Sequence, residues 1–213
     1  DSVASRGLGD VYKDRFSGKA SAQVIGRGDR LDALHAALVN GISSHVLDYD
    51  DTHLKTIIHP AGPVASAILA VSEGCAVSGK DFLTALIAGI EVECRIGNSV
   101  YPDHYDRGWH ITGTAGVFGA AAATGRLLAL SEQQMTWALS LAATQASGLR
   151  EMFGTMTKSF HPGRAAQNGA MAAFLASDFD SSERGIEAPR GFANLLSTKQ
   201  DYDEILGGLG QRW

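Results

Sequence analysis

The chain has 213 residues, a length that suits one large domain or two small ones. Hydrophobic residues make up 45% and charged residues 19%, a composition typical of a folded globular protein rather than a disordered one. The net charge of −5 comes without a basic stripe, and no apolar run could span a bilayer, so we expect neither nucleic acid nor a membrane as partner. Two cysteines without a C-x-x-C motif exclude a disulfide scaffold and favour a cytoplasmic location.

Apolar residues at steps of three and four predict helices along most of the chain. The first covers residues 29–46, with Asp29 as its N-cap. Further helices are expected in residues 63–79, 80–100, 110–130, 131–148 and 161–179. Ser131 and Gln134 form a capping box, and Pro162 occupies a first-turn position. The pattern predicts an all-α protein of five or six helices.

Small residues form a stripe in the helix expected at 110–130. Gly113, Gly116, Ala120 and Ala123 recur at three- and four-residue steps, so neighbouring helices can approach closely and this helix should be central and buried. No linker divides the chain, and we expect residues 1–213 to form a single helical domain. The last residues, ILGGLGQRW, resemble the start of another element, so we expect an incomplete part of a longer protein.

The segment D-Y-D-D-T at residues 48–52 has two interpretations. It matches the nucleophile loop of a D-x-D-x-T phosphohydrolase, but that fold needs a buried strand before the first aspartate, and here the preceding run has helical spacing. It also fits the rim of a helical pocket, with Asp48 and Thr52 on one face if the helix continues. A metal site from Asp48, Asp50, Asp51 and His53 matches no standard ligand set, so we expect no metal.

Two further clusters carry groups suited to chemistry. His110 lies where the small-residue helix should begin, and Lys158, His161 and Arg164 crowd the start of a later helix. Cations at a helix start oppose the macrodipole, which favours a site for carboxylate or phosphate over a structural role. The alternatives are a packing loop around His110 and a basic surface patch.

These clusters together favour proton transfer beside a carboxylate. Pro60 places His59 on a turn, near Asp48 and Thr52 in sequence. Histidines next to cations suit elimination, decarboxylation or epimerisation of a polyanionic small molecule. The sequence has no nucleophile elbow, phosphate-binding loop or dinucleotide motif.

The segments HVLDYDDTHLKTIIHPAG, GWHITGTAGVFGAAAA and GTMTKSFHPGRAAQNGAMAAFLA together resemble the MmgE/PrpD family. The resemblance implies a helical-bundle domain, usually in a homodimer, that acts on citrate-like polycarboxylates without a metal or an organic cofactor. It also implies a second, α+β lid domain, which we expect to be absent from this chain. The implied catalytic residues are Asp48, His59, His110 and Lys158, with Thr52, His161 and Arg164 expected to bind substrate.

The resemblance leaves the reaction open, because the gap between Thr52 and His59 varies among the family's activities. We put the dehydration of a 2-methylcitrate-like substrate first. Decarboxylation of cis-aconitate and epimerisation of iminodisuccinate are the alternatives within the family. A non-catalytic polycarboxylate-binding or dimerisation module is the alternative from another class, since without a lid the site stays open to water and the fragment alone should be weakly active at most.

Overall fold

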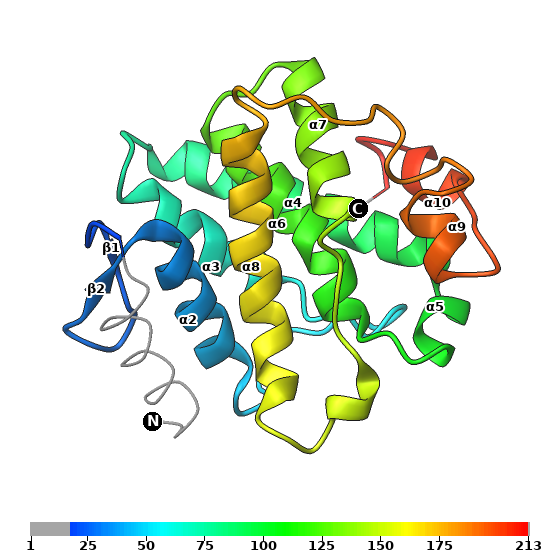
Figure 1. Cartoon of the computed structure of the whole chain (residues 1–213), viewed down its shortest axis with the longest axis horizontal. Helices are drawn as coiled ribbons and strands as arrows, with labels where there is room; N and C mark the ends of the chain where they lie inside the picture. Colours follow the sequence, from blue (N-terminus) through cyan, green and yellow to red (C-terminus); the bar gives the residue numbers. More distant parts are fainter. Residues whose placement is uncertain (1–17, 213) are drawn as a thin grey trace.

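The computed structural model describes residues 18–212 and shows a helical domain (Figure 1). A two-stranded antiparallel hairpin comes first, formed by β1 (Ala22–Gln23) and β2 (Arg30–Leu31). The long helices are α2 (Ala33–His45), α3 (Ala61–Ser72), α4 (Gly79–Val100), α6 (Ile111–Leu127), α7 (Glu132–Ala143) and α8 (Thr157–Leu175). The short ones are α5 (Asp103–Asp106), the 3-10 turn η1 (Arg150–Met152), α9 (Phe192–Leu196) and α10 (Asp203–Leu206). The all-α prediction is confirmed.

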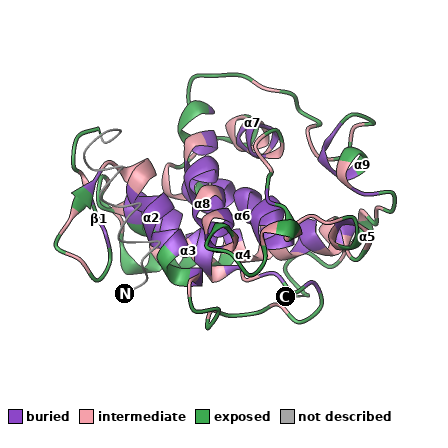
Figure 2. Ribbon diagram, turned by 60° about the horizontal axis from the view of Figure 1, so that its bottom comes forward, coloured by how far each residue is buried: buried purple, intermediate pink, exposed green. Residues whose placement is uncertain are grey.

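Helix α6 is the centre of the bundle and packs against α3, α4, α7 and α8. Every residue from Ile111 to Gly125 is buried, and Figure 2 shows α6 mostly in purple at the middle of the bundle. The prediction of a buried central helix at the small-residue stripe is therefore confirmed. Because the side chains of α6 are so small, the backbones of the neighbouring helices approach α6 closely and exclude solvent from it.

Glycines set the distance between α2 and α8, and this crossing positions the candidate site. A Cβ added to Gly41 would lie 2.6 Å from the Cα of Gly163, and one added to Gly163 would lie 2.5 Å from the carbonyl oxygen of Leu38. Real Cβ atoms are not found at such distances, so only glycine fits either position. His45 lies one turn beyond Gly41 and His161 two residues before Gly163, so the crossing brings both histidines to the same end of the bundle.

Several predicted helix boundaries are wrong. Helix α2 begins at Ala33, with Asp32 as the N-cap that accepts from two backbone N–H groups, and Asp29 instead belongs to the hairpin turn. Helix α8 begins at Thr157, so Pro162 is its sixth residue rather than a first-turn residue. Helices α3 and α7 are shorter than predicted, whereas the capping box of Ser131 and Gln134 is confirmed.

In the described part of the chain, no helix is both long enough and apolar enough to cross a bilayer. The run before Asp48 is helix α2, so the strand that a D-x-D-x-T phosphohydrolase requires at this point is not there.

Candidate active site

The candidate site lies where α2 ends and where α3, α6 and α8 begin. His45 is the last residue of α2, His59 lies just before α3, His110 is the N-cap of α6, and Lys158 is the second residue of α8. His110 provides no side-chain cap for the first turn of α6, whereas at the start of α8 Thr155 Oγ1 accepts from the backbone N–H of Thr157 at 3.2 Å. Free backbone N–H groups and the positive ends of these helix dipoles therefore favour an anion here.

Asp48 is held at the centre of the site by a left-handed turn. Its φ of 57° ends the path of α2, so the helix does not continue to Thr52 and the two residues do not share a helix face. The Lys158 ammonium donates to Asp48 Oδ1 at 2.7 Å, and this hydrogen bond lowers the pKa of the carboxyl. The Nε2 atoms of His45 and His59 each lie 3.8 Å from the same oxygen.

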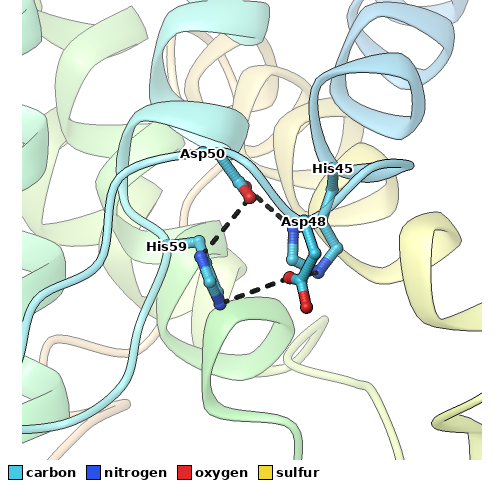
Figure 3. Close-up of side chains that lie close together, drawn as sticks. All are labelled: His45, Asp48, Asp50 and His59. Atoms are coloured by element: carbon cyan, nitrogen blue, oxygen red, sulfur yellow. Dashed lines mark hydrogen bonds and ion pairs between the residues drawn. The ribbon is translucent and has the colours of Figure 1, made fainter.

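Asp50 lies on the opposite side of these two imidazoles (Figure 3). One of its oxygens, Oδ2, is 2.8 Å from His45 Nδ1, and the other, Oδ1, is 3.4 Å from His59 Nδ1. Thr52 Oγ1 also lies 3.4 Å from His59 Nδ1. The backbone N–H of His59 donates to Thr112 Oγ1 on α6 at 3.2 Å, which fixes this turn against the central helix.

His110 and His161 form a buried imidazole pair. Their Nδ1 atoms are 2.8 Å apart, so one ring donates and the other accepts a single proton. Burial lowers the pKa of His110 to about 2, and the nearby His161, His45 and Lys158 act in the same direction. Burial also lowers the pKa of His161. Both rings are therefore neutral at pH 7. The Phe153 ring packs edge-on against His110, with 4.9 Å between the ring centroids.

The structure brings together six of the seven residues that the sequence predicts for the site: Asp48, Thr52, His59, His110, Lys158 and His161. Arg164 is different. It lies about two turns into α8, where its guanidinium donates to Gln167 Oε1 at 2.5 Å. Among residues 18–212, no hydrogen bond joins Arg164 to the histidines, so its role in substrate binding stays a prediction.

The site predicted from the sequence did not include His45, and Asp50 was considered there only as a metal ligand. His45 lies three residues after Ile42 on the apolar stripe of α2 and is only 2% exposed. A histidine at an apolar position of the helical repeat was the feature of the sequence that could have indicated it. For Asp50, the sequence does not indicate whether it or the adjacent Asp51 of the D-Y-D-D-T segment faces the histidines. Asp51 instead accepts from the backbone N–H of Ala61 at the start of α3.

Four side chains of the site could hold a metal ion by their spacing. His45, Asp48, Asp50 and His59 each offer a ligand atom, and these atoms lie within 4.8 Å of one another. Of the metal ligands considered from the sequence, Asp51 binds the start of α3, and His53 pairs with Thr56 at 2.7 Å. The Lys158 ammonium competes with a metal ion for Asp48 Oδ1, the oxygen that faces both Nε2 atoms.

Two cavities in the described part of the chain lie beside the site rather than in it. One of about 820 Å³ lies between α7 and the segment 181–196 and is lined by none of the candidate residues. Another of about 600 Å³ lies between α2 and α3, and Asp50 and Asp51 line it. Cavity volume alone would therefore place the active site away from the histidines. The cluster of histidines and carboxylates is the stronger indication of where the active site lies.

Comparison with known proteins gives a consistent answer. The family model for the MmgE/PrpD N-terminal domain matches residues 4–205. The chain is 33% identical to the cis-aconitate decarboxylase of Aspergillus terreus, over 93% of this chain and 44% of that protein. It is 36% identical to the human cis-aconitate decarboxylase, over 79% of this chain and 36% of that protein, and 37% identical to the mouse one, over 78% and 35%. The chain thus spans less than half the length of these relatives. On the family match and these identities, the chain belongs to the MmgE/PrpD family and comprises its N-terminal domain.

Proposed function

We propose that the protein is a cofactor-independent lyase of a citrate-like polycarboxylate, with the decarboxylation of cis-aconitate as its first candidate reaction. The observation that carries the proposal is the convergence of Lys158, His45 and His59 on one carboxylate oxygen, that of Asp48. The names of the A. terreus, human and mouse relatives support cis-aconitate as the substrate. The dehydration of a 2-methylcitrate-like substrate, put first from the sequence, stays a prediction.

The site offers several groups for binding carboxylates. Lys158 supplies a full positive charge, and the uncapped start of α6 supplies backbone N–H groups. A polyanion that entered here would compete with Asp48 for the Lys158 ammonium, since both present carboxylate oxygens. Asp48 carries a side chain that is 54% exposed, so it has room to move aside.

A proton donor must then meet the reacting carbon. Loss of CO2 breaks a carbon–carbon bond and leaves its electron pair on the substrate, and one proton must be added to carbon to complete the reaction. The His59 imidazole is the better donor, because its side chain is 16% exposed, so water can reach it, and its Nε2 lies 3.8 Å from Asp48 Oδ1. His110 is a poor donor, since burial holds its ring neutral.

Proton NMR in D2O with the full-length gene product tests the proposal. The mixture would contain cis-aconitate, 2-methylcitrate, citrate and iminodisuccinate. We expect cis-aconitate to lose CO2 and give a five-carbon dicarboxylic acid that carries one deuterium on carbon. Vinyl signals from 2-methylcitrate would instead favour dehydration, and deuterium exchange in iminodisuccinate without loss of carbon would favour epimerisation.

A non-catalytic role in polycarboxylate binding or dimerisation is the rival from another class. It predicts that cis-aconitate raises the melting temperature while none of the four acids is converted. Conversion of any one of them would exclude this role for the full-length protein.

A further inference from the structure

The carboxylate of Asp50 lies between two imidazoles and contacts the same atom of each. Its Oδ2 is 2.8 Å from His45 Nδ1, and its Oδ1 is 3.4 Å from His59 Nδ1. The two rings are 4.8 Å apart and inclined at 62°. The Asp50 side chain is 9% exposed, so water does not compete strongly for these oxygens. The Asp50 carboxylate therefore faces both imidazoles on the side opposite Asp48, as Figure 3 shows.

An ionised carboxylate can only accept hydrogen bonds. His45 Nδ1, which is hydrogen-bonded to Asp50 Oδ2, must then carry a hydrogen. The same tautomer of His59 would bring an N–H to the buried Asp50 Oδ1, which lies 3.4 Å from His59 Nδ1 and has no hydrogen-bond partner among the described residues. A neutral ring with hydrogen on Nδ1 has its lone pair on Nε2. Both Nε2 atoms face the other way and lie 3.8 Å from Asp48 Oδ1. The two lone pairs are therefore presented to one point, beside the Lys158 ammonium.

The Nε2 atom of His45 adds an independent observation. It is buried and has no hydrogen-bond partner among the residues that the structure describes. A buried polar atom without a partner costs about 1–3 kcal/mol. This atom faces Asp48 Oδ1, the oxygen that the Lys158 ammonium binds, so a ligand group that displaced Asp48 from Lys158 could supply the missing partner.

We propose that Asp50 is the positioning residue of this site, and that it acts through His45 and His59. It fixes both rings in the tautomer with the lone pair on Nε2 and directs both Nε2 atoms to the place where substrate replaces Asp48. This inference rests on the proposed function. In the reaction, His59 takes up a proton from water at Nε2 and passes it to the substrate carbon that holds the electron pair left by CO2, while Nδ1 keeps its hydrogen toward Asp50 throughout.

Histidine-selective ¹⁵N NMR of the full-length gene product tests the tautomers directly. Spectra of His45→Gln and His59→Gln variants assign the two rings. In the wild type at pH 8 we expect both rings to carry hydrogen on Nδ1. In Asp50→Asn the amide presents one acceptor oxygen and one N–H2 donor, so one ring should change to the Nε2–H tautomer. Hydrogen on Nε2 of either ring in the wild type would overturn the proposal.

Kinetics of Asp50→Asn provide the functional readout, with Asp51→Asn as the matched control. We expect Asp50→Asn to lower kcat on the order of 10²-fold, with KM changed by less than about threefold, because a wrong tautomer impairs proton transfer more than binding. Asp51→Asn keeps the acceptor for Ala61 N–H at the start of α3 and should leave both constants unchanged. Wild-type kcat in Asp50→Asn would overturn the proposal.

The two experiments separate failure of this inference from failure of the proposed function. If the wild type converts none of the four acids, the proposed function fails, and the tautomers seen by NMR still decide the role of Asp50. If Asp50→Asn does not fold, as judged by circular dichroism, the wild-type spectrum alone decides.

Discussion

Lys158 Nζ lies 2.7 Å from Asp48 Oδ1 and joins two segments that are 110 residues apart in the sequence. The contact is between the turn after α2 and the first turn of α8. A lysine at a helix start opposes the helix dipole, and the partner that compensates this cost is a carboxylate beside two histidines. The ion pair therefore contributes more to the site than to the stability of the fold. Replacing Lys158 tests these two contributions separately.

We expect Lys158→Ala to lower kcat/KM by on the order of 10²-fold or more, because the charge that holds a substrate carboxylate is lost. The melting temperature should change little, since the Asp48 partner is 54% exposed and an ion pair of this kind stabilises a fold weakly. Steady-state kinetics and a thermal melt check both. Lys55→Ala is the control, because Lys55 pairs with Glu204 at the surface and should keep full activity. Wild-type turnover in Lys158→Ala would remove this residue from the site.

Gly41→Ala should destabilise the protein by about 1–3 kcal/mol, because the new methyl group would overlap the backbone of Gly163. Activity should fall as well, since the same crossing positions His45 and His161. Gly79→Ala is the matched control. Gly79 is the first residue of α4 and has open space around it, so alanine there should be neutral or slightly stabilising. Denaturant unfolding measures both, and equal effects of the two changes would contradict the close crossing.

Much of the fold and of the site followed from the sequence, for reasons that differ between elements. The small-residue stripe predicted that α6 is the central helix, because Gly113 and Gly116 have no side chain that would keep neighbouring helices at a distance. Five of the seven predicted site residues meet because they lie at or close to helix ends, namely Asp48, His59, His110, Lys158 and His161. The boundary of α2 did not follow, because Asp29 and Asp32 are both good N-caps and only the hairpin pairing decides between them.

The pairing within the site could not be read from the sequence. Asp50 and Asp51 are adjacent, and which one faces the histidines depends on the left-handed turn at Asp48. Homodimer formation and a cytoplasmic location also stay predictions.

Glu93→Gln should stabilise the protein at high pH. Glu93 on α4 is fully buried, and neither of its carboxyl oxygens has a hydrogen-bond partner in the described residues. Burial, reinforced by Asp51, raises the pKa of this carboxyl well above its usual range. A raised folded-state pKa gives stability that is complete below the unfolded pKa and is lost as the pH rises through the folded pKa. The glutamine variant removes this loss, because its amide does not ionise.

Thermal melts at pH 5 and pH 8 check the prediction for Glu93. The melting temperature of Glu93→Gln relative to the wild type should be higher at pH 8 than at pH 5. Glu132→Gln is the control, since Glu132 is exposed at the start of α7 and its effect should not change between these pH values. An equal difference at both pH values for Glu93→Gln would mean that the buried carboxyl does not titrate in this range.

Turnover should survive dialysis against EDTA, and added Zn²⁺ should inhibit. The spacing of His45, Asp48 and His59 suits a zinc ion, but Lys158 competes for the Asp48 oxygen. Inhibition should be reversed by EDTA, and calorimetry should show tighter Zn²⁺ binding to Lys158→Ala, in which Asp48 is released. Loss of activity in EDTA that Zn²⁺ restores would mean the opposite, a metal-dependent reaction.

The His110–His161 pair should stay neutral from pH 5 to pH 8. Burial lowers the pKa of His110 to about 2 and lowers that of His161, and the 2.8 Å contact between their Nδ1 atoms needs one ring to accept. A lowered folded-state pKa gives stability that is complete above the unfolded pKa, near 6.5, and is lost as the pH falls below it, since the unfolded rings then take up protons. NMR titration of the folded protein should show fixed ring shifts for both residues, with the urea-unfolded protein as the titrating control. A midpoint near 6.5 for either folded ring would show that the pair does take up a proton, and His110 would then regain its place as a proton donor to the substrate.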